Sequence, residues 1–516
     1  MSRAVPQWHE YAILVALFLL AVLLRFPSLE QPFDNDSGAI AYHARRIVRG
    51  EPLYGAHHPS HHLPAAYYAY ALAFTLLGDS VWAVKFLLLP WTALTVYLVY
   101  RLGRLLVDRK MGLLAAVFYA FLSSDVLLFG SSAEIEIFAN LARVAAPLIA
   151  VSLSRRGRRA WLFLFVGLVS GIALLFKVVY VSPLAMTGFV LLFEVWSSKS
   201  RSAAWQRAIR CGLWTGLGFV LALAVTVGYF ASQGLWSRLL LVLTIGQEYL
   251  AMRNAASSFL AHVLLYPLGV ITSRNVVLAV CAIAGWITAF LEQYRAIRAR
   301  SKAILLQMFA VLWLLFALVE SGVSRVAFPH YYQLVIPPLA MLAAWFVYRL
   351  VGMLRLQYPK GAVVVLVLIV AVVVGMSLKQ NIHYYTTYAH YKLGVGTYED
   401  FVRYGWHRAA GEEFIRVQEL ADYVRERTLS TDRIYYWSGG VQIYYLADRL
   451  CPIDIVWPVY AEATGPYQRI FGEQTQYVIL GESNNIPRAD WLYTELTGKY
   501  VLETTIRDQE VYRRID

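Results

Sequence analysis

Long apolar runs recur along this 516-residue chain and constrain its fold more than any other feature. A helix needs about 20 mostly apolar residues to cross roughly 30 Å of hydrocarbon. Runs near this length, about eleven in all, lie at 11–26, 81–107, 112–129, 135–153, 161–176, 178–196, 210–231, 275–292, 303–320, 331–350 and 361–378. Only 15% of the residues are charged, against roughly 25% in soluble proteins. The sequence therefore predicts a polytopic α-helical membrane protein with about eleven transmembrane helices.

The basic residues are distributed unevenly between the loops of the two sides. Alternate loops are rich in arginine and lysine, namely those holding Arg109 and Lys110, Arg155 to Arg159, Lys199 to Arg210, Arg295 to Lys302, and Arg349 to Lys360. The short outer loops near 130–134, 177 and 321–330 carry only Lys177 and Arg325. By the positive-inside rule, this asymmetry predicts a cytoplasmic N-terminus in a cell (inner or plasma) membrane. It also accounts for the net charge of +13 without nucleic acid as a partner.

The apolar run near the N-terminus and the polar C-terminal part indicate how the chain divides into domains. The run at 11–26 has no small-residue cleavage site, so we expect it to be kept as the first span. An odd number of spans places residues 380–516 outside the cytoplasm. A helical pattern at 412–427 and strand patterns at 433–437, 477–480, 500–504 and 510–513 predict an α/β domain there. We therefore expect a transmembrane domain at 1–379, with a long first outer loop at 27–79, followed by a soluble domain at 380–516.

Ionisable residues gather on the outer face, where they are functional hypotheses by default. Loop 27–79 begins with an acidic pair, continues with an amphipathic helix at 39–50, and then has four histidines. The polar residues of this face are Asp34, Asp36, His57, His58, His61, His62, Glu134, Glu136, Lys177, Arg325 and His330, with Tyr331 beside the last. A carboxylate can take a proton from a hydroxyl, while lysine and arginine can hold a lipid phosphate. The simpler alternative is that these are solvated loop charges and tyrosines that anchor helices.

The order of these residues resembles a known family. Asp34-Asn-Asp36, Tyr42, Ala44-Arg45, Gly50-Glu-Pro-Leu-Tyr54, Pro64, Tyr67, Tyr68 and Gly78-Asp-Ser80 look like the first loop of GT-C glycosyltransferases. The similar branch is that of protein O-mannosyltransferases and lipid A aminoarabinose transferases. Further matching segments are Glu136-Ile-Phe138, Gly171 to Lys177, Phe328 to Pro338, Asp432 to Trp437 and Ile443 to Leu446. The resemblance covers most of the chain and rests on the order of the motifs.

The resemblance implies a GT-C fold and sugar transfer outside the cytoplasm. The donor would be an undecaprenyl- or dolichyl-phosphate sugar, and the acceptor a hydroxyl of a protein, glycan or lipid. Asp36 takes the family's catalytic acidic position, where it would act as the base of an inverting reaction. Asp34 would orient Asp36, share a divalent cation (Mg²⁺, Mn²⁺ or Ca²⁺) with it, or cap the following helix. Glu136 matches the acidic position of the second outer loop, with Glu134 as its neighbour.

The remaining site residues divide by ligand. The residues expected at the donor phosphate are Lys177, Arg325, His62, His61 and His330, and those expected to contact substrate are Tyr42, Arg45, Tyr54 and Tyr331. The family often has a lysine in the turn where this chain has His61-His62-Leu63-Pro64, so phosphate binding there would depend on histidine protonation. Four histidines also suggest zinc, but their crowded spacing and the lack of a nearby acid or cysteine argue against it. No cofactor is required by this reading, and the divalent cation stays optional.

Two other functions compete with the transferase. A transporter or flippase of a lipid-linked glycan would be expected to show internal repeats and charges near the bilayer midplane. The sequence shows no repeat, and its charges are expected at helix ends. A non-enzymatic anchor for the C-terminal domain would not need eleven spans or a long polar loop. The three cysteines are too few for a disulfide framework or a metal quartet.

Overall fold

The computed structural model describes residues 7–59, 62–254, 258–299, 304–405, 408–458, 467–472, 474–481 and 490–515. The chain forms two compact units. The first consists of Met1–Pro27, Phe86–Gly228 and Leu250–His383, and the second of Ser28–Lys85, Tyr229–Tyr249 and Tyr384–Asp516. The second unit thus combines the long loop after the first span with the C-terminal part of the chain.

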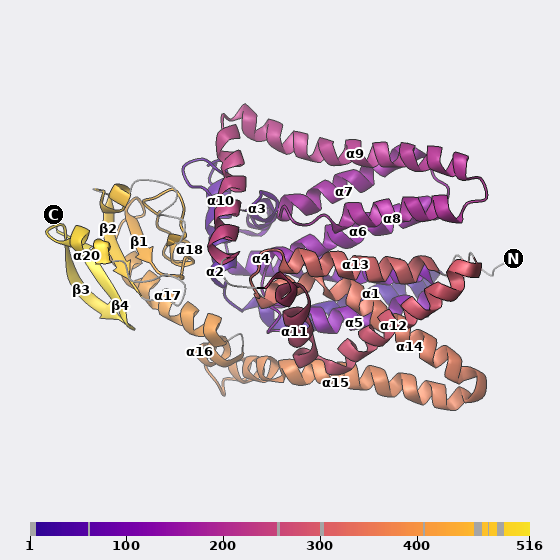
Figure 1. Cartoon of the computed structure of the whole chain (residues 1–516). Coiled ribbons are helices and arrows are strands. Elements are labelled where there is room, and N and C mark those ends of the chain that lie inside the picture. The colour runs from indigo at the N-terminus through magenta and orange to yellow at the C-terminus, as the bar shows by residue number, and fades with distance from the viewer. Residues whose placement is uncertain are drawn as a thin grey trace. The chain divides into compact units, whose positions relative to one another are not determined.

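Within the described residues, a helix lies at each of the eleven predicted spans (Figure 1). They are α1 (Gln7–Arg25), α4 (Val81–Leu106), α5 (Arg109–Ser123), α6 (Ile135–Arg155), α7 (Phe163–Phe176), α8 (Ser182–Ser197), α9 (Arg201–Ser232), α12 (Val276–Ala299), α13 (Ile304–Gly322), α14 (Ile336–Gln357) and α15 (Pro359–Lys392). By length and composition, six helices of the described part can cross a membrane. The prediction of a polytopic helical membrane protein is confirmed.

The first unit is a bundle of these helices. Helix α6 packs against α7 and α8, and α14 packs against both α5 and α12. Their buried faces meet in one large apolar core, in which Phe118, Trp313 and Met341 are fully buried. The helix α11 (Tyr266–Arg274) was not predicted. Short 3₁₀ turns lie at Phe26–Leu29, Ala160–Leu162 and Pro329–Leu334, and a single π turn lies at Ala261–Leu265.

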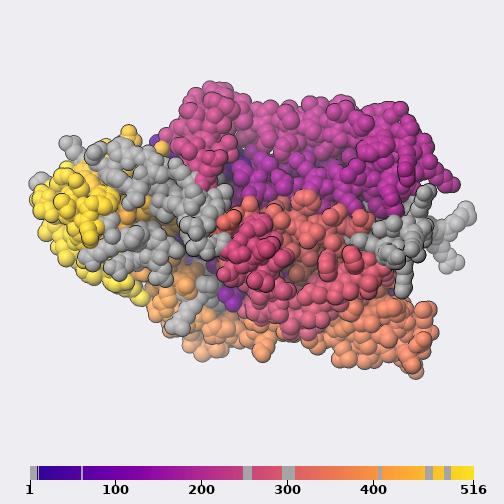
Figure 2. Space-filling view, in the orientation of Figure 1, coloured from indigo at the N-terminus to yellow at the C-terminus, as the bar shows by residue number. Residues whose placement is uncertain are grey.

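Two long helices of this unit expose apolar side chains where a soluble protein would have polar ones. In Figure 2, α9 (magenta) and α15 (orange) form part of the visible surface. On α9 the exposed side chains include Leu213, Leu217 and Val225, and on α15 they include Val363 and Val367. Contiguous apolar surface of this kind is typical of helices that face lipid. The exposure therefore supports the membrane assignment independently of helix length.

Helix α15 extends beyond the predicted span at 361–378 and passes the predicted domain boundary at 379–380. Its last turns lie in the second unit, where Tyr384, Tyr388 and Tyr391 pack their rings against Phe401. The chain stays helical although its hydropathy falls, because this aromatic cluster buries one side of the polar extension. The end of the apolar run is therefore not the end of the helix.

The second unit is α/β. Its helices are α2 (Asn35–Val48), α3 (Ala65–Leu77), α10 (Trp236–Asn254), α16 (Tyr398–Asp400), α17 (Arg408–Arg427), α18 (Ile443–Ala447) and α20 (Asp490–Leu496), with a π turn at Phe401–Gly405 and a 3₁₀ turn at Tyr467–Phe471. The strands β1 (Arg433–Trp437), β2 (Thr475–Leu480), β3 (Tyr500–Ile506) and β4 (Gln509–Arg514) form a sheet in the order β1-β2-β4-β3. Strands β1 and β2 are parallel, while β4 is antiparallel to both β2 and β3. All four predicted strands are confirmed.

Helix α2 of the first loop packs directly on α18 of the C-terminal part. Gly38 lies at the closest point, where an added Cβ would be 2.3 Å from the Cβ of Gln442. Only glycine allows the two helices to approach so closely. This contact places the start of α2, with its acidic pair, against the C-terminal part of the same unit.

Candidate functional site

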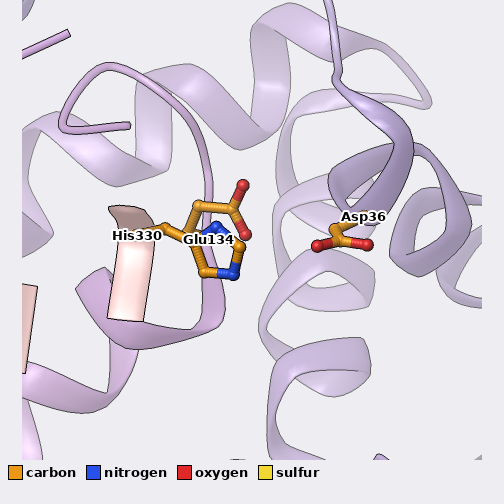
Figure 3. Close-up of side chains that lie close together, drawn as sticks. All are labelled: Asp36, Glu134 and His330. Atoms are coloured by element: carbon orange, nitrogen blue, oxygen red, sulfur yellow. The ribbon is translucent and has the colours of Figure 1, made fainter. Parts of the chain in front are cut away.

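The acidic pair of the first loop lies where α2 begins. Asp34 is the N-cap residue, and its Oδ1 accepts a hydrogen bond of 2.8 Å from the Ser37 amide. Its Oδ2 is buried and has no hydrogen-bond partner among the described residues. Asp36 lies in the first turn of the helix and is half-buried (Figure 3). Capping requires an oxygen acceptor at Asp34, and the helix dipole favours a negative charge in the first turn. The capping role considered for Asp34 is therefore what the structure shows.

Arg45, expected to contact substrate, joins several parts of the second unit. Its guanidinium donates to the Tyr445 carbonyl oxygen at 2.7 Å and pairs with Asp79 at 2.5 Å and with Asp448 at 3.2 Å. It also lies 3.8 Å above the centre of the Tyr445 ring. These contacts occupy the side chain within the unit. Arg45 therefore links the first loop to the C-terminal part, and its contact with substrate stays a prediction.

Two tyrosines expected to contact substrate are also buried in this unit. The Tyr42 hydroxyl accepts a hydrogen bond of 3.3 Å from the Cys451 amide. The Tyr54 hydroxyl donates to the His62 carbonyl oxygen at 2.9 Å, and Tyr54 has a φ of 66°. Both side chains are buried. Tyr42 and Tyr54 therefore help to hold the loop in shape, and a substrate contact for either stays a prediction.

Two histidines of the loop, His57 and His58, are likewise buried and hydrogen-bonded within the second unit. Nε2 of His57 lies 2.8 Å from the Cys451 carbonyl oxygen, and Nε2 of His58 lies 2.7 Å from the Arg238 carbonyl oxygen. Burial lowers the pKa of both rings to about 4, so both are neutral near pH 7. His61 lies outside the described residues. Within the described part of the second unit, no group of three metal-ligating side chains forms around these histidines.

In the first unit, the buried Glu136 and the half-buried Lys177 form an ion pair. The Lys177 Nζ lies 3.3 Å from Glu136 Oε1, and the Tyr180 hydroxyl donates to the same oxygen at 3.0 Å. The ammonium group also lies 3.7 Å from the centre of the Tyr331 ring. Lys177 follows the end of α7, and Glu136 occupies the first turn of α6. Glu136 therefore supplies the negative charge beside Lys177, and the expected contact of Lys177 with the donor phosphate stays a prediction.

Glu134 and His330 lie near one another in this unit. A carboxylate oxygen of Glu134 and a ring nitrogen of His330 are within 4.8 Å, and Figure 3 shows the ring beside the carboxylate. The His330 ring stacks on Phe328 and meets Phe129 edge-on. Two ligand atoms can share a cation but do not complete its coordination. Arg325, on the segment before His330, is half-buried and has a φ of 50°.

A buried ion pair between α6 and α13 was not predicted from the sequence. Arg143 on α6 pairs with Glu320 on α13, and the Ser182 amide donates to Glu320 at 2.6 Å. Arg143 lies roughly 12 Å along α6 from its first residue, so the expectation that charges occur only at helix ends is wrong. The sequence feature that could have revealed this pair is the arginine inside the apolar run 135–153. The pair is fully buried and hydrogen-bonded, which is how buried charges are tolerated.

Comparison with known proteins gives a partial family match and full-length structural matches. Residues 57–230 match the model of the dolichyl-phosphate-mannose-protein mannosyltransferase family. No curated protein matches the chain in sequence. The crystal structure of ArnT from Cupriavidus metallidurans bound to undecaprenyl phosphate matches with a TM-score of 0.56 and 15% identity, over 99% of each chain.

An archaeal enzyme gives a similar match. The Archaeoglobus fulgidus oligosaccharyltransferase in its apo form has a TM-score of 0.55 and 14% identity, over 92% of this chain and 70% of its own. AglB from the same organism, in complex with an inhibitory peptide and a dolichol-phosphate, has a TM-score of 0.52 and 13% identity. At this level of identity the matches show a common fold. The predicted GT-C fold is confirmed.

Proposed function

We propose that this chain is a membrane glycosyltransferase of the GT-C superfamily, of the protein mannosyltransferase and ArnT type, and that it uses a polyprenyl-phosphate sugar. The sugar would pass to a hydroxyl of a protein, glycan or lipid on the extracytoplasmic face of a cell membrane. The observation that carries this proposal is the match to ArnT over 99% of both chains, since that structure contains undecaprenyl phosphate. The family match of residues 57–230 supports it independently.

In this proposal Asp36 is the general base. Its carboxylate takes the proton of the acceptor hydroxyl while the hydroxyl oxygen bonds to the anomeric carbon. The bond from that carbon to the phosphate oxygen breaks, and polyprenyl phosphate leaves with the bonding electrons. Attack opposite the leaving group inverts the anomeric configuration. The half-buried position of Asp36 in the first turn of α2 supports this role, because Asp34 already provides the cap.

The groups proposed for the donor phosphate are Lys177, Arg325, His62, His61 and His330. Lys177 is the strongest of these, since its ammonium group lies between the Glu136 carboxylate and the Tyr331 ring. A phosphate there would share the cation with Glu136. Lysine and arginine are suited to such a group because they donate charge-assisted hydrogen bonds.

A divalent cation is an optional part of the proposal. The buried Asp34 Oδ2, which lacks a hydrogen-bond partner among the described residues, fits a hard cation such as Mg²⁺ or Ca²⁺. Bound there with Asp36, the cation would offset charge on the donor phosphate. Asp34, having one oxygen committed to the cap, would supply a single ligand atom.

The decisive experiment uses the purified full chain in lipid nanodiscs with a panel of polyprenyl-phosphate sugars. We expect release of free polyprenyl phosphate that requires a hydroxyl acceptor, with the sugar recovered on that acceptor. A flippase would move the lipid-linked sugar across vesicles and leave it intact. Recovery of only intact donor with every sugar and acceptor offered would contradict the transferase proposal.

A further inference from the structure

Arg143 lies inside the apolar run of α6 and is fully buried together with Glu320 of α13. An ionisable residue in a membrane-spanning helix is costly, and it is a functional hypothesis by default. The Nε of Arg143 is buried without a hydrogen-bond partner among the described residues, which adds to that cost. Apolar side chains of similar volume often stabilise a protein as well as a buried ion pair does. Stability alone therefore does not account for this pair, and its contacts indicate another role.

One terminal nitrogen of the Arg143 guanidinium group holds the start of α8. Its Nη2 donates to Glu320 and, at 3.3 Å, to the Ser182 hydroxyl. Glu320 also accepts a hydrogen bond of 2.6 Å from the Ser182 amide and one of 3.1 Å from the Ser182 hydroxyl. Ser182 is the first residue of α8, and Lys177 directly follows the end of α7. The ion pair thus fixes one end of the short segment 177–182, which begins with Lys177.

The other terminal nitrogen of this guanidinium group holds a second segment. Its Nη1 donates to the Leu334 carbonyl oxygen at 3.2 Å and to the Asn140 side chain at 2.7 Å. Asn140 in turn donates to the Gln333 carbonyl oxygen at 2.9 Å. Gln333 and Leu334 end the 3₁₀ turn Pro329–Leu334, which also carries Tyr331. One side chain therefore fixes both this turn and the start of α8.

The Lys177 ammonium group lies beside side chains from the elements that Arg143 holds. It is 3.7 Å from the centre of the Tyr331 ring and 3.3 Å from Oε1 of Glu136, which is two turns before Arg143 on α6. Tyr180, within the segment 177–182, donates to the same Glu136 oxygen at 3.0 Å. The Arg143 guanidinium group lies 5.6 Å from the centre of the Tyr180 ring. The surroundings of the ammonium group therefore depend on Arg143.

We propose that Arg143 is a positioning residue, which sets the place of the Lys177 ammonium group by fixing the start of α8 and the 3₁₀ turn together. This inference rests on the proposed function where it assigns Lys177 to the donor phosphate. A group that is already held in its bound position loses less freedom when the ligand binds, so the affinity is higher. Arginine suits this role because its planar fork presents two nitrogens in a fixed geometry, whereas lysine offers only one.

The test neutralises the pair and follows Lys177 directly. In Arg143→Met/Glu320→Gln, glutamine still accepts from the Ser182 amide, but the guanidinium links to both segments are lost. The full chain in lipid nanodiscs is treated with acetic anhydride, and acetylation of Lys177 is followed by peptide mass spectrometry. We expect faster acetylation than in the wild type, because an amine that its neighbours no longer hold is more accessible to the reagent.

Kinetics with a polyprenyl-phosphate sugar provide the second measurement. For the folded double variant we expect the KM for the donor to rise about tenfold with kcat nearly unchanged, as for a loss of ground-state binding. A purely structural pair would lower the melting temperature and leave the KM of the folded molecules as it is. If the double variant does not fold, Arg143→Lys replaces it with the same expectations, since it keeps the charge but not the fork.

The matched control is Arg274→Met/Asp125→Asn, which neutralises another buried pair of the same unit by the same kind of change. Among the described residues, neither side chain of this pair bonds to segment 177–182 or to the 3₁₀ turn. We therefore expect wild-type acetylation of Lys177 and a wild-type KM.

Two outcomes would overturn the positioning role. One is unchanged acetylation of Lys177 in the folded Arg143→Met/Glu320→Gln, and the other is an equal effect of the control variant. Faster acetylation in a chain that transfers no sugar would support the positioning role and contradict the proposed function alone. Faster acetylation with an unchanged donor KM would overturn the link between Arg143 and donor binding.

Discussion

At the scale of single residues, Asp34 and Asp36 have different surroundings although only one residue separates them. Asp34 is buried and bonded to the Ser37 amide, while Asp36 lies in the first turn and is half-buried. A carboxylate that caps a helix contributes to folding through one oxygen acceptor, which asparagine also supplies. A general base must instead accept a proton, which asparagine does not do. Replacing aspartate by asparagine at each position therefore distinguishes a capping residue from a general base.

For Asp36→Asn we expect kcat to fall by about 10²–10⁴-fold with little change in the melting temperature. Asp34→Asn should keep most of both activity and stability, since asparagine is also a good N-cap. Turnover and thermal melts of the two variants, measured side by side, test this. Near-normal turnover in Asp36→Asn would remove Asp36 as the base. A collapse of both variants that responds to added Mg²⁺ or Mn²⁺ would indicate a shared cation.

His57 and His58 make the stability of the second unit depend on pH. Burial holds the pKa of each at about 4, against about 6.5 in the unfolded chain. The unfolded state therefore binds protons first as the pH falls. The stabilisation is complete above pH 6.5 and is lost progressively between pH 6.5 and 4, by up to about 2 kcal/mol per histidine at pH 5.

Thermal melts at pH 7.5 and pH 5 test this linkage. We expect His57→Gln/His58→Gln to show a smaller drop in melting temperature at pH 5 than the wild type, because glutamine can donate to the same carbonyl oxygens but does not titrate. The exposed His390→Gln serves as the control and should behave as the wild type does. An unchanged pH dependence in the double variant would contradict the assignment.

At the scale of elements, the first loop and the C-terminal part are one folded body. Asp448, which follows α18, pairs with Arg45 on α2 and with Arg49, the residue that ends α2. Asn35 at the start of α2 donates to Glu413 on α17 at 2.7 Å. The C-terminal part therefore holds both ends of the helix on which Asp36 lies. Its role at this scale is to position the first loop.

Asp448→Asn tests that role. Asparagine tolerates the left-handed backbone at this position, where φ is 51°, so the change removes the charge without adding strain. We expect a loss of about 1 kcal/mol in the stability of the second unit, because the pairs are partly exposed. Asp422→Asn, whose partner Arg425 is on the same helix, should have a smaller effect. Chemical denaturation of both variants gives the comparison, and equal effects would contradict the role of Asp448.

At the scale of the whole molecule, contacts within the second unit bear on topology. The His58 amide donates to the Asp454 carbonyl oxygen, and His57 contacts Cys451, so loop 27–79 touches the C-terminal part directly. Such contacts cannot form across a bilayer, so both segments lie on the same side. Ten of the eleven predicted spans lie between loop 27–79 and residue 380. An even number of crossings returns the chain to the same side of the membrane, which agrees with these contacts. The loop charges predict that this side is extracytoplasmic.

Cysteine labelling in intact cells checks the predicted orientation. Ala56→Cys and Ser430→Cys, both exposed in the second unit, should react with a membrane-impermeant reagent. Ser200→Cys, exposed in the basic loop between α8 and α9, should react only after permeabilisation. The three native cysteines are buried, which keeps the background low. The reverse pattern would invert the topology.

The amino-acid sequence by itself determined the features that depend on neighbouring residues. The apolar runs fixed the eleven helices, and alternation of side chains predicted β1 to β4, because helix and strand periods are local. Asp34 could be foreseen as a cap from its place before a helix. The tertiary structure alone decided the pairing of Lys177 with Glu136, Arg143 with Glu320, and Arg45 with Asp448. These partners are far apart in the chain, and a charge pattern carries no information on which distant partner neutralises a buried group. The same holds for Tyr42 and Tyr54, whose motif positions suggested substrate but whose burial depends on how the C-terminal part folds over the loop.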